Sequence, residues 1–186
     1  MSFKNRTKNM YATALQEILQ TQTFEKVQVK DICEKCGTRR QTFYYHFRDK
    51  YDLVAWIFNQ DYTAVFCTHN YEFSEERLIE ILDIIKAKKS FYKKTLNEHS
   101  QNSIQKYIQD FDVKIGEKVV KSAYSLEHVT EEQLYAIKYH SYGCIGLLIE
   151  WLANDLPLTT QQFAHYQYET MPDFLRNAYI KYHSKH

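Results

Sequence analysis

The chain contains little glycine and proline: four Gly and two Pro in 186 residues. Because these residues mark turns and interrupt regular elements, their scarcity argues against a protein built from many short strands and loops. No alternation of apolar and polar residues persists along the chain, so strands are disfavoured on that ground as well. Together these absences predict an all-α protein with short connections.

Long apolar segments and an apolar N-terminal leader are also missing. The N-terminus is polar through Met10, and no apolar run approaches the roughly 20 residues that a membrane-spanning helix needs. The four Cys are expected to be free thiols, since nothing in the sequence points to an oxidising compartment. We therefore expect a cytoplasmic protein without membrane association.

The sequence patterns of common catalytic and cofactor sites are absent too. There is no Gly-rich phosphate loop and no nucleophile-elbow pattern, and the His residues are scattered. His128, His140 and His165 could meet in the folded chain, but isolated His residues among aromatic groups more often serve packing than metal binding or catalysis. We expect no enzymatic activity, no catalytic residues, no cofactor and no bound metal.

What the chain does have is an uneven distribution of charge. Residues 1–50 contain ten Lys and Arg against five Asp and Glu, a net charge of +5, whereas the remainder carries a net charge of −4. A basic end on a nearly neutral chain is typical of a DNA-binding domain attached to a solvated body, although chance variation of surface charge would look the same.

One stretch, Gly37–Lys50, has the pattern of a turn, a short helix and the start of the next helix. Gly37 suits a tight turn that requires a positive φ. Phe43 and Phe47 are four residues apart, so they share one helical face and can anchor the helix to a core. The opposite face carries hydrogen-bonding side chains, with Arg39–Arg40 at its start. A helix that enters the major groove usually reads base edges with N-terminal residues of this kind.

The run Gly-x-x-Arg-x-Thr-Phe-Tyr-Tyr-His-Phe-x-x-Lys-x-x-Leu, ending at Leu53, resembles the DNA-binding signature of the TetR family of transcriptional regulators. The likeness extends back through Ile32 to a first helix near Thr7–Thr21. Within that family, Arg39–Tyr44 followed by Trp56–Phe58 is similar to regulators of the dihydroxyacetone kinase type. Some of those regulators activate transcription and respond to a protein partner.

The resemblance implies a domain organisation and a DNA-binding surface. A helix-turn-helix DNA-binding domain would span residues 1–50, a connecting helix would run over about 50–67, and a helical effector-binding and dimerisation domain would span 51–186. The dimer would bind a palindromic operator in double-stranded DNA. The expected DNA-contacting residues are four near base edges and four near phosphates, namely Arg39, Arg40, Gln41 and Thr42, then Tyr44, Tyr45, His46 and Lys50.

The helix before this stretch departs from the family pattern at two places. The family usually has Thr or Ser at its start, where this chain has Gln28 and Val29, so the usual hydroxyl cap is missing. Cys33 and Cys36 replace residues that are normally Ala and form a Cys-x-x-Cys motif. A metal or redox site would need further Cys or His partners at suitable spacing, and none is visible. Thiols filling small core positions are favoured, and a thiol or metal sensor is the alternative.

The rest of the chain is interpreted as the helices of a separate body. Ser74–Glu76 marks a helix start, and Ser103–Tyr124 predicts a long helix. Thr130-x-x-Gln133 resembles a capping box, and the helix that it opens is apolar on most sides from Tyr139 to Leu152. Such a helix must be buried, either centrally or against another subunit. Pro172 predicts a kink or break in the last helix.

The family resemblance also implies partners for this body. The last two long helices would pair with their copies to form a homodimer, and the central helices would enclose a pocket for an unknown small-molecule effector, unless a protein co-regulator acts instead. The predicted pocket-lining residues are Tyr92, Phe111, Tyr139, Tyr142 and Trp151. The alternative function is a helical small-molecule-binding protein, or a thiol or metal sensor, with little sequence-specific DNA binding.

Overall fold

The computed structural model describes residues 3–66, 73–96, 104–155 and 157–183, and within these ranges it contains α-helices, one 3₁₀ turn and no strand. The expected all-α fold is therefore confirmed for the described part of the chain. In chain order the elements are α1 (Phe3–Thr21), η1 (Phe24–Lys26), α2 (Val29–Lys35), α3 (Arg40–His46), α4 (Lys50–Phe66), α5 (Glu75–Ala87), α6 (Lys89–Leu96), α7 (Ile104–Tyr124), α8 (Glu131–Ala153), α9 (Thr160–Glu169) and α10 (Asp173–His183).

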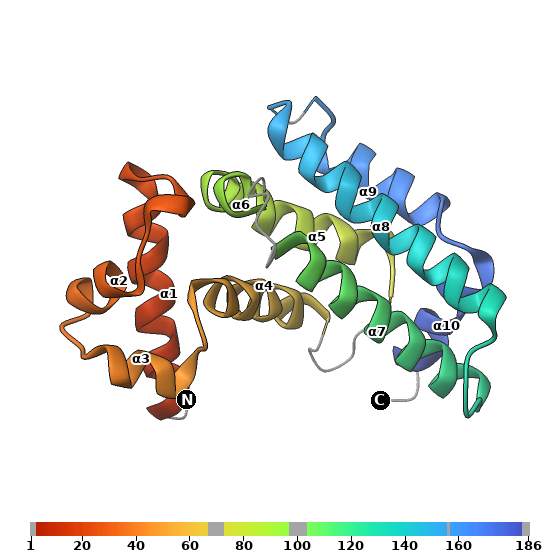
Figure 1. Cartoon of the computed structure of the whole chain (residues 1–186). Helices are drawn as coiled ribbons and strands as arrows, with labels where there is room; N and C mark the ends of the chain where they lie inside the picture. Colours follow the sequence, from red (N-terminus) through yellow and green to blue (C-terminus); the bar gives the residue numbers. More distant parts are fainter. Residues whose placement is uncertain (1–2, 67–72, 97–103, 156, 184–186) are drawn as a thin grey trace.

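The helices α1, α2 and α3 form a separate head at one end of the molecule (Figure 1). Its core is aromatic: the rings of Tyr11 and Phe43 meet edge to face with centroids 5.2 Å apart, and Phe43 lies 5.6 Å from Phe47. All three side chains are buried. The predicted sharing of one face by Phe43 and Phe47 is confirmed, and edge-to-face contacts of this kind favour a defined orientation of α3 on α1.

Carboxylates define the starts of two helices in and beside the head. At α2 the backbone N–H of Gln28 donates to the Asp31 carboxylate at 2.8 Å, so Asp31 takes up part of the role of the missing hydroxyl cap. At α4 the backbone N–H of Asp52 donates to Asp49 at 2.8 Å, as expected for an N-cap. The helix α4 then leads from the head into the body (Figure 1), and its Trp56 contacts Phe47 of the head with ring centroids 5.9 Å apart.

The body consists of α5–α10, with α7 packed between α8 and α10 and with α9 packed against α5. Where α7 meets α8, a Cβ added to Gly116 would lie 2.8 Å from Ile137, so the glycine permits this close approach. The capping box is confirmed: Thr130 and Gln133 exchange two hydrogen bonds of 2.9 and 3.1 Å at the start of α8. None of the described helices is long and apolar enough to cross a membrane.

The expected helix boundaries agree closely with the structure. The connecting helix ends at Phe66, and the expected end at Cys67 lies outside the described residues, as does the expected start of α7 at Ser103. The predicted break at Pro172 separates α9 from α10. These two helices diverge: α10 packs on α7, whereas α9 lies beside α8 on the outside of the body (Figure 1).

Candidate nucleic-acid interface and internal cavity

The helix α3 presents a polar face to solvent because its apolar residues are anchored inside the head. Phe43 is fully buried beneath it. The four side chains predicted to lie nearest base edges are all exposed, and they occupy the start of the helix: Arg39, Arg40, Gln41 and Thr42. The structure thus brings together the predicted base-reading group on one accessible helix end, which is the geometry that major-groove readers use.

The turn before α3 depends on the backbone of Gly37. Its φ is +62°, in the left-handed region that side chains with a Cβ rarely adopt. Backbone bonds on both sides fix the turn: the Gly37 N–H donates to Glu34 at 3.1 Å and the Thr38 N–H donates to Cys33 at 2.9 Å. The Tyr11 hydroxyl donates to Thr38 Oγ1 at 2.9 Å, which attaches the turn to α1. The direction of α3 is therefore set by the turn and the core together.

The aromatic residues predicted to contact phosphates differ in exposure. Tyr44 and Tyr45 project from α3 and are 55% and 73% exposed. His46 is half-buried, with its ring 5.0 Å from Tyr45 and 6.3 Å from Tyr11. The two tyrosines are accessible to a phosphate backbone, whereas His46 is largely held in the head by its aromatic neighbours.

The structure gives Lys50 partners within the head, beside the phosphate contact expected from the sequence. Its ammonium group donates to the backbone carbonyls of Phe24 at 2.7 Å, Val27 at 3.1 Å and Glu25 at 3.2 Å, and it lies 4.4 Å from the centre of the Phe24 ring. An ammonium has three N–H donors. Because carbonyls of Phe24, Glu25 and Val27 accept from them, this lysine holds the η1 turn against the start of α4, and its contact with a phosphate stays a prediction.

The Cys-x-x-Cys motif has the properties of core packing. Cys33 is buried, and the Cys36 thiol lies 3.6 Å from the Met10 carbonyl oxygen, to which it can donate. Burial raises the pKa of both thiols, that of Cys36 to about 11, so almost no thiolate forms near neutral pH. Among the described residues no cluster of His, Cys, Asp or Glu is suited to hold a metal ion.

The five residues predicted to line an effector pocket do not meet in one place. Tyr92 is buried with its hydroxyl donating to Asp61 at 2.5 Å, and Phe111 packs half-buried against the ring of Tyr62. Trp151 is buried and stacked on Phe163, whereas Tyr139 and Tyr142 are exposed on the outer face of α8. None of the five lines the internal cavity, whereas Tyr139 and Tyr142 line the outer groove described below. An effector pocket formed by these residues stays a prediction.

An internal cavity of about 120 Å³ lies between α4, α5, α7, α8 and α10. Its walls are mostly apolar, and the polar side chains that reach it are Asp112, His140, Cys144 and Gln167. Asp112 was not among the residues that the sequence predicted to form a site. Its position one residue after Phe111, at the border of the apolar stripe, was the available signal.

Two titratable groups of this cavity, His140 and Cys144, are held in their neutral forms near neutral pH. Burial lowers the pKa of His140 to about 4 and, together with the neighbouring Asp112, raises the pKa of the Cys144 thiol to about 12. The Cys144 sulfur lies 3.5 Å from His140 Nε2. Burial also raises the pKa of Asp112, opposed by the nearby Ser141 hydroxyl. A catalytic thiol or a charged imidazole is therefore disfavoured here.

A groove of about 680 Å³ lies on the outside of the body between α8 and α9. It is lined by Tyr139, Tyr142, Leu147 and Tyr166, which are 45 to 75% exposed. The helix α8 is therefore not buried on all sides within one chain. Its inner face borders the cavity and its outer face borders the groove, and His140, Cys144 and Gln167 line both spaces.

Two family models match the chain and together cover most of it. The model described as "Bacterial regulatory proteins, tetR family" matches residues 12–57, and the model described as "Transcriptional regulator C-terminal region" matches residues 72–173. The first match contains the head and the start of α4, and the second contains the body up to the start of α10.

Comparison with individual proteins gives the same fold. The HTH-type dhaKLM operon transcriptional activator DhaS of Lactococcus lactis subsp. lactis (strain IL1403) is 28% identical over 89 residues, which span 47% of this chain and 48%, about half, of that protein. A solved structure of the dihydroxyacetone kinase operon activator DhaS superposes with a TM-score of 0.62 at 19% identity, covering 89% of this chain and 93% of that one. The fatty acid degradation regulator FadR from Bacillus halodurans gives a TM-score of 0.58 at 13% identity, covering 92% and 95%.

Proposed function

Because this chain belongs to the TetR family of transcriptional regulators, we propose that it binds a palindromic operator as a homodimer in the cytoplasm and responds to an effector in its body. The observation that carries the proposal is the polar N-terminal end of α3, which faces solvent because the buried Phe43 anchors the helix to the head. The relationship to DhaS, an operon activator, supports activation as the direction of regulation.

The chemistry of this helix end suits base recognition. An arginine can pair with guanine and a glutamine with adenine, each through two hydrogen bonds worth about 1–3 kcal/mol of discrimination against the wrong base. Arg39, Arg40 and Gln41 supply these groups on adjacent positions. Tyr44 and Tyr45 extend the surface toward the phosphate backbone, where contacts fix the register of the helix.

The groove between α8 and α9 supports the homodimer. Leu147 is 54% exposed there, and Cβ atoms added to Gly143 and Gly146 would meet nothing within 4 Å. Exposed apolar groups beside open glycines suit the close approach of a second helix, and a twofold axis would place the same face of another copy against this one. The dimer would set two α3 helices one turn of DNA apart, roughly 34–36 Å.

The short helix α6 provides a route from the body to the head. Its Lys94 donates to the carbonyls of Leu19 and Gln22 at the end of α1, and its Tyr92 bonds to Asp61 of α4. A movement of α6 would therefore act on both helices that support α3.

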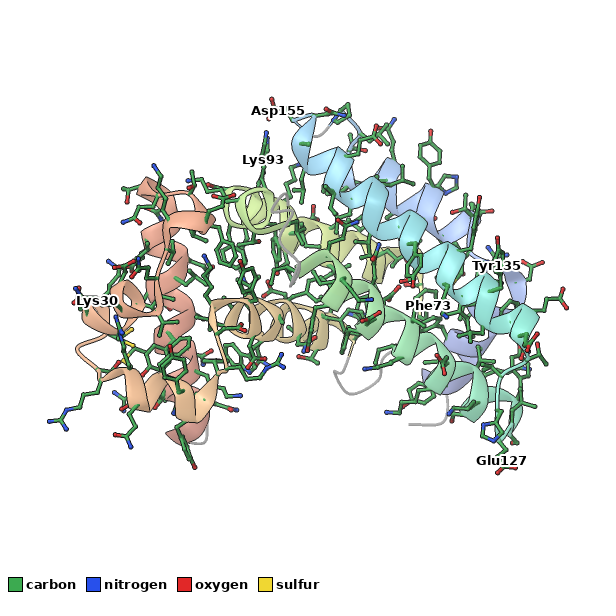
Figure 2. The ribbon with its side chains drawn as sticks, viewed as in Figure 1. Lys30, Phe73, Lys93, Glu127, Tyr135 and Asp155 are labelled. Carbon is green, nitrogen blue, oxygen red and sulfur yellow. The ribbon has the colours of Figure 1, made fainter. Side chains whose placement is uncertain are left out.

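The other side of α6 is attached to the end of α8. Lys93 donates to the Ala153 carbonyl at 3.1 Å and lies 3.5 Å from Asp155. Figure 2 labels Lys93 and Asp155 at the top of the molecule. Lys89 also pairs with Asp155 at 3.0 Å. Cations at the carbonyl end of a helix are favoured by its dipole, so these contacts join α6 to α8. A shift of α8 on effector binding would reach the head through them.

Fluorescence anisotropy on labelled duplexes tests operator binding. DNA from upstream of the protein's own gene and its neighbours would be compared with random duplex, using the wild type, Gln41→Ala, and Lys138→Ala on α8 as the control. We expect salt-sensitive binding that prefers a palindrome, a preference reduced by about 5–150-fold in Gln41→Ala, and no change in the control. Absence of binding by the wild type even at low salt would contradict the proposal and favour the alternative of a ligand-binding protein.

Sedimentation equilibrium tests the dimer with two exposed leucines. Leu147 lies in the groove, whereas Leu126, 37% exposed, lies outside it between α7 and α8. We expect Leu147→Glu to be a monomer and Leu126→Glu to remain a dimer, because only the first places a charge in the proposed interface. If both variants were monomers, or both were dimers, the result would contradict this interface.

A further inference from the structure

Two carboxyl groups, one beside the body and one in it, are shielded from solvent: Asp61 is 8% exposed and Asp112 is half-buried. Only Asp61 has an ion-pair partner among the described residues. Asp61 on α4 is paired with the Lys88 ammonium at 2.5 Å and accepts the hydrogen bond of Tyr92 at 2.5 Å. Asp112 on α7 reaches the internal cavity and has no ion pair within residues 3–66, 73–96, 104–155 and 157–183. A buried carboxylate without a cation is costly, so Asp112 requires an explanation that Asp61 does not.

The cavity itself supplies no cation to Asp112. No Lys or Arg of the described ranges lines it, and the imidazole of His140 is neutral near neutral pH because burial lowers its pKa to about 4. The Cys144 thiol is neutral as well. Beside the carboxyl, Ser141 is 1% exposed, and its hydroxyl has no hydrogen-bond partner at normal distance among the described side chains and backbone. Asp112 is therefore a carboxyl without a cation at a mostly apolar space, and the Ser141 hydroxyl lies near it.

We propose that the internal cavity binds a small apolar amine, whose ammonium group pairs with the carboxylate of Asp112. This inference rests on the proposed function, in which the body senses an effector, and it names the chemical class of that effector. An ammonium carries three N–H donors and one positive charge, which complement the acceptor oxygens and the negative charge of a carboxylate. The apolar walls suit a hydrocarbon group on the same molecule.

The volume of the cavity limits the size of the amine. A cavity of about 150 Å³ lined by apolar side chains accommodates benzene, so about 120 Å³ suits a molecule of roughly five or six non-hydrogen atoms. Butylamine and cyclopentylamine have this size. Butanol and cyclopentanol have nearly the same shape without the charge, and they are the matched neutral probes.

Isothermal titration calorimetry of the full chain at pH 7 with these four compounds tests the proposal. We expect each amine to bind at least tenfold more tightly than its alcohol. The preference should disappear in Asp112→Asn and persist in Asp110→Asn, the matched control on the exposed side of α7, where Asp110 pairs only with Lys106 at the surface. Equal binding of amine and alcohol, a preference that survives Asp112→Asn, or no binding by any probe would each overturn the proposal.

A second measurement separates ligand recognition from a structural role of Asp112. In the absence of ligand, Asp112→Asn should melt at a higher temperature than the wild type at pH 7, because it removes a buried acid that nothing compensates. A lower melting temperature would mean that the carboxylate is satisfied in the free protein and would contradict the proposal. DNA binding is measured separately, so a protein that binds its operator but shows no preference for amines would overturn this inference alone.

Discussion

Replacing Lys50 by methionine distinguishes a lysine that holds the head together from one that binds DNA. Methionine keeps an unbranched apolar stem of similar length and removes the ammonium group. The change deletes three hydrogen bonds to the carbonyls of Phe24, Glu25 and Val27 and the contact with the Phe24 ring. It leaves the exposed surface of α3 unaltered, because Lys50 belongs to the first turn of α4.

The size of the expected loss in the free energy of unfolding follows from these contacts. A hydrogen bond to a charged group contributes about 1.5–3 kcal/mol when it is shielded, and a cation over an aromatic ring contributes about 0.5–1 kcal/mol at exposed sites. Lys50 is only half-buried, so water competes for its donors and the full sum does not apply. One bond of 2.7 Å and two longer bonds then lead us to expect a loss of about 2–3 kcal/mol in the free energy of unfolding.

Urea unfolding and salt-dependent DNA binding provide the two measurements. A residue that neutralises one phosphate contributes about 0.9 to the slope of log K against log salt. We expect Lys50→Met to lose stability and to keep this slope, measured on random duplex under conditions where the variant is folded. Arg48→Met, an exposed cation two residues earlier, is the control for stability and should change it by less than about 0.5 kcal/mol. If Lys50→Met kept the wild-type stability and its slope of log K against log salt were smaller by about one, the proposed role of Lys50 in holding the η1 turn would be refuted.

Three further predictions concern a turn, a helix contact and a titrating group. Gly37→Ala should cost about 1–2 kcal/mol because φ is +62°, and Gly37→Asn should cost less; equal losses in urea unfolding would exclude the backbone explanation. Gly116→Ala should cost about 1–3 kcal/mol because the new methyl group meets Ile137 at 2.8 Å, whereas Gly146→Ala on the open face should not destabilise the chain. Because the pKa of His140 is depressed in the folded chain, the unfolded chain binds more protons between pH 6.5 and about 4. The free energy of unfolding should therefore decrease as the pH is lowered from 6.5 to about 4, by at most roughly 3 kcal/mol. His140→Gln should lose this dependence relative to the wild type, and an unchanged pH profile would contradict it.

The head was predictable from sequence because its determinants are local. The spacing of Phe43 and Phe47, the glycine at the turn and the cap by Asp49 each act within a few residues, and all three are present as expected. Lys50 was the exception. Its carbonyl partners Phe24–Val27 precede it by more than 20 residues, and no pattern in the sequence indicates that a lysine will bind backbone oxygens of an earlier turn.

The cavity was not predictable because it depends on how the body helices are rotated and spaced. Aromatic residues were the natural choice for its lining, but Trp151 stacks on Phe163 and Tyr92 bonds to Asp61, while Tyr139 faces outward. A helical-wheel projection of α7 alone places Asp112 near the polar side of that helix. Only the approach of α7 to α8 at Gly116 encloses that carboxyl, and helical periodicity carries no information about a neighbouring helix.

The helix α8 is the element in which the two proposals about the body meet. Its inner face, through His140 and Cys144, borders the cavity, and its outer face, through Leu147, borders the groove proposed to bind a second copy. The two surfaces belong to the same helix, and His140 and Cys144 line both spaces. A ligand that moves this helix must therefore alter the packing of the dimer and, through Lys93 of α6, the support of the head. A coupling of about 1–3 kcal/mol between these sites would change DNA affinity by about 5–150-fold, without any contact between the ligand and the recognition helix.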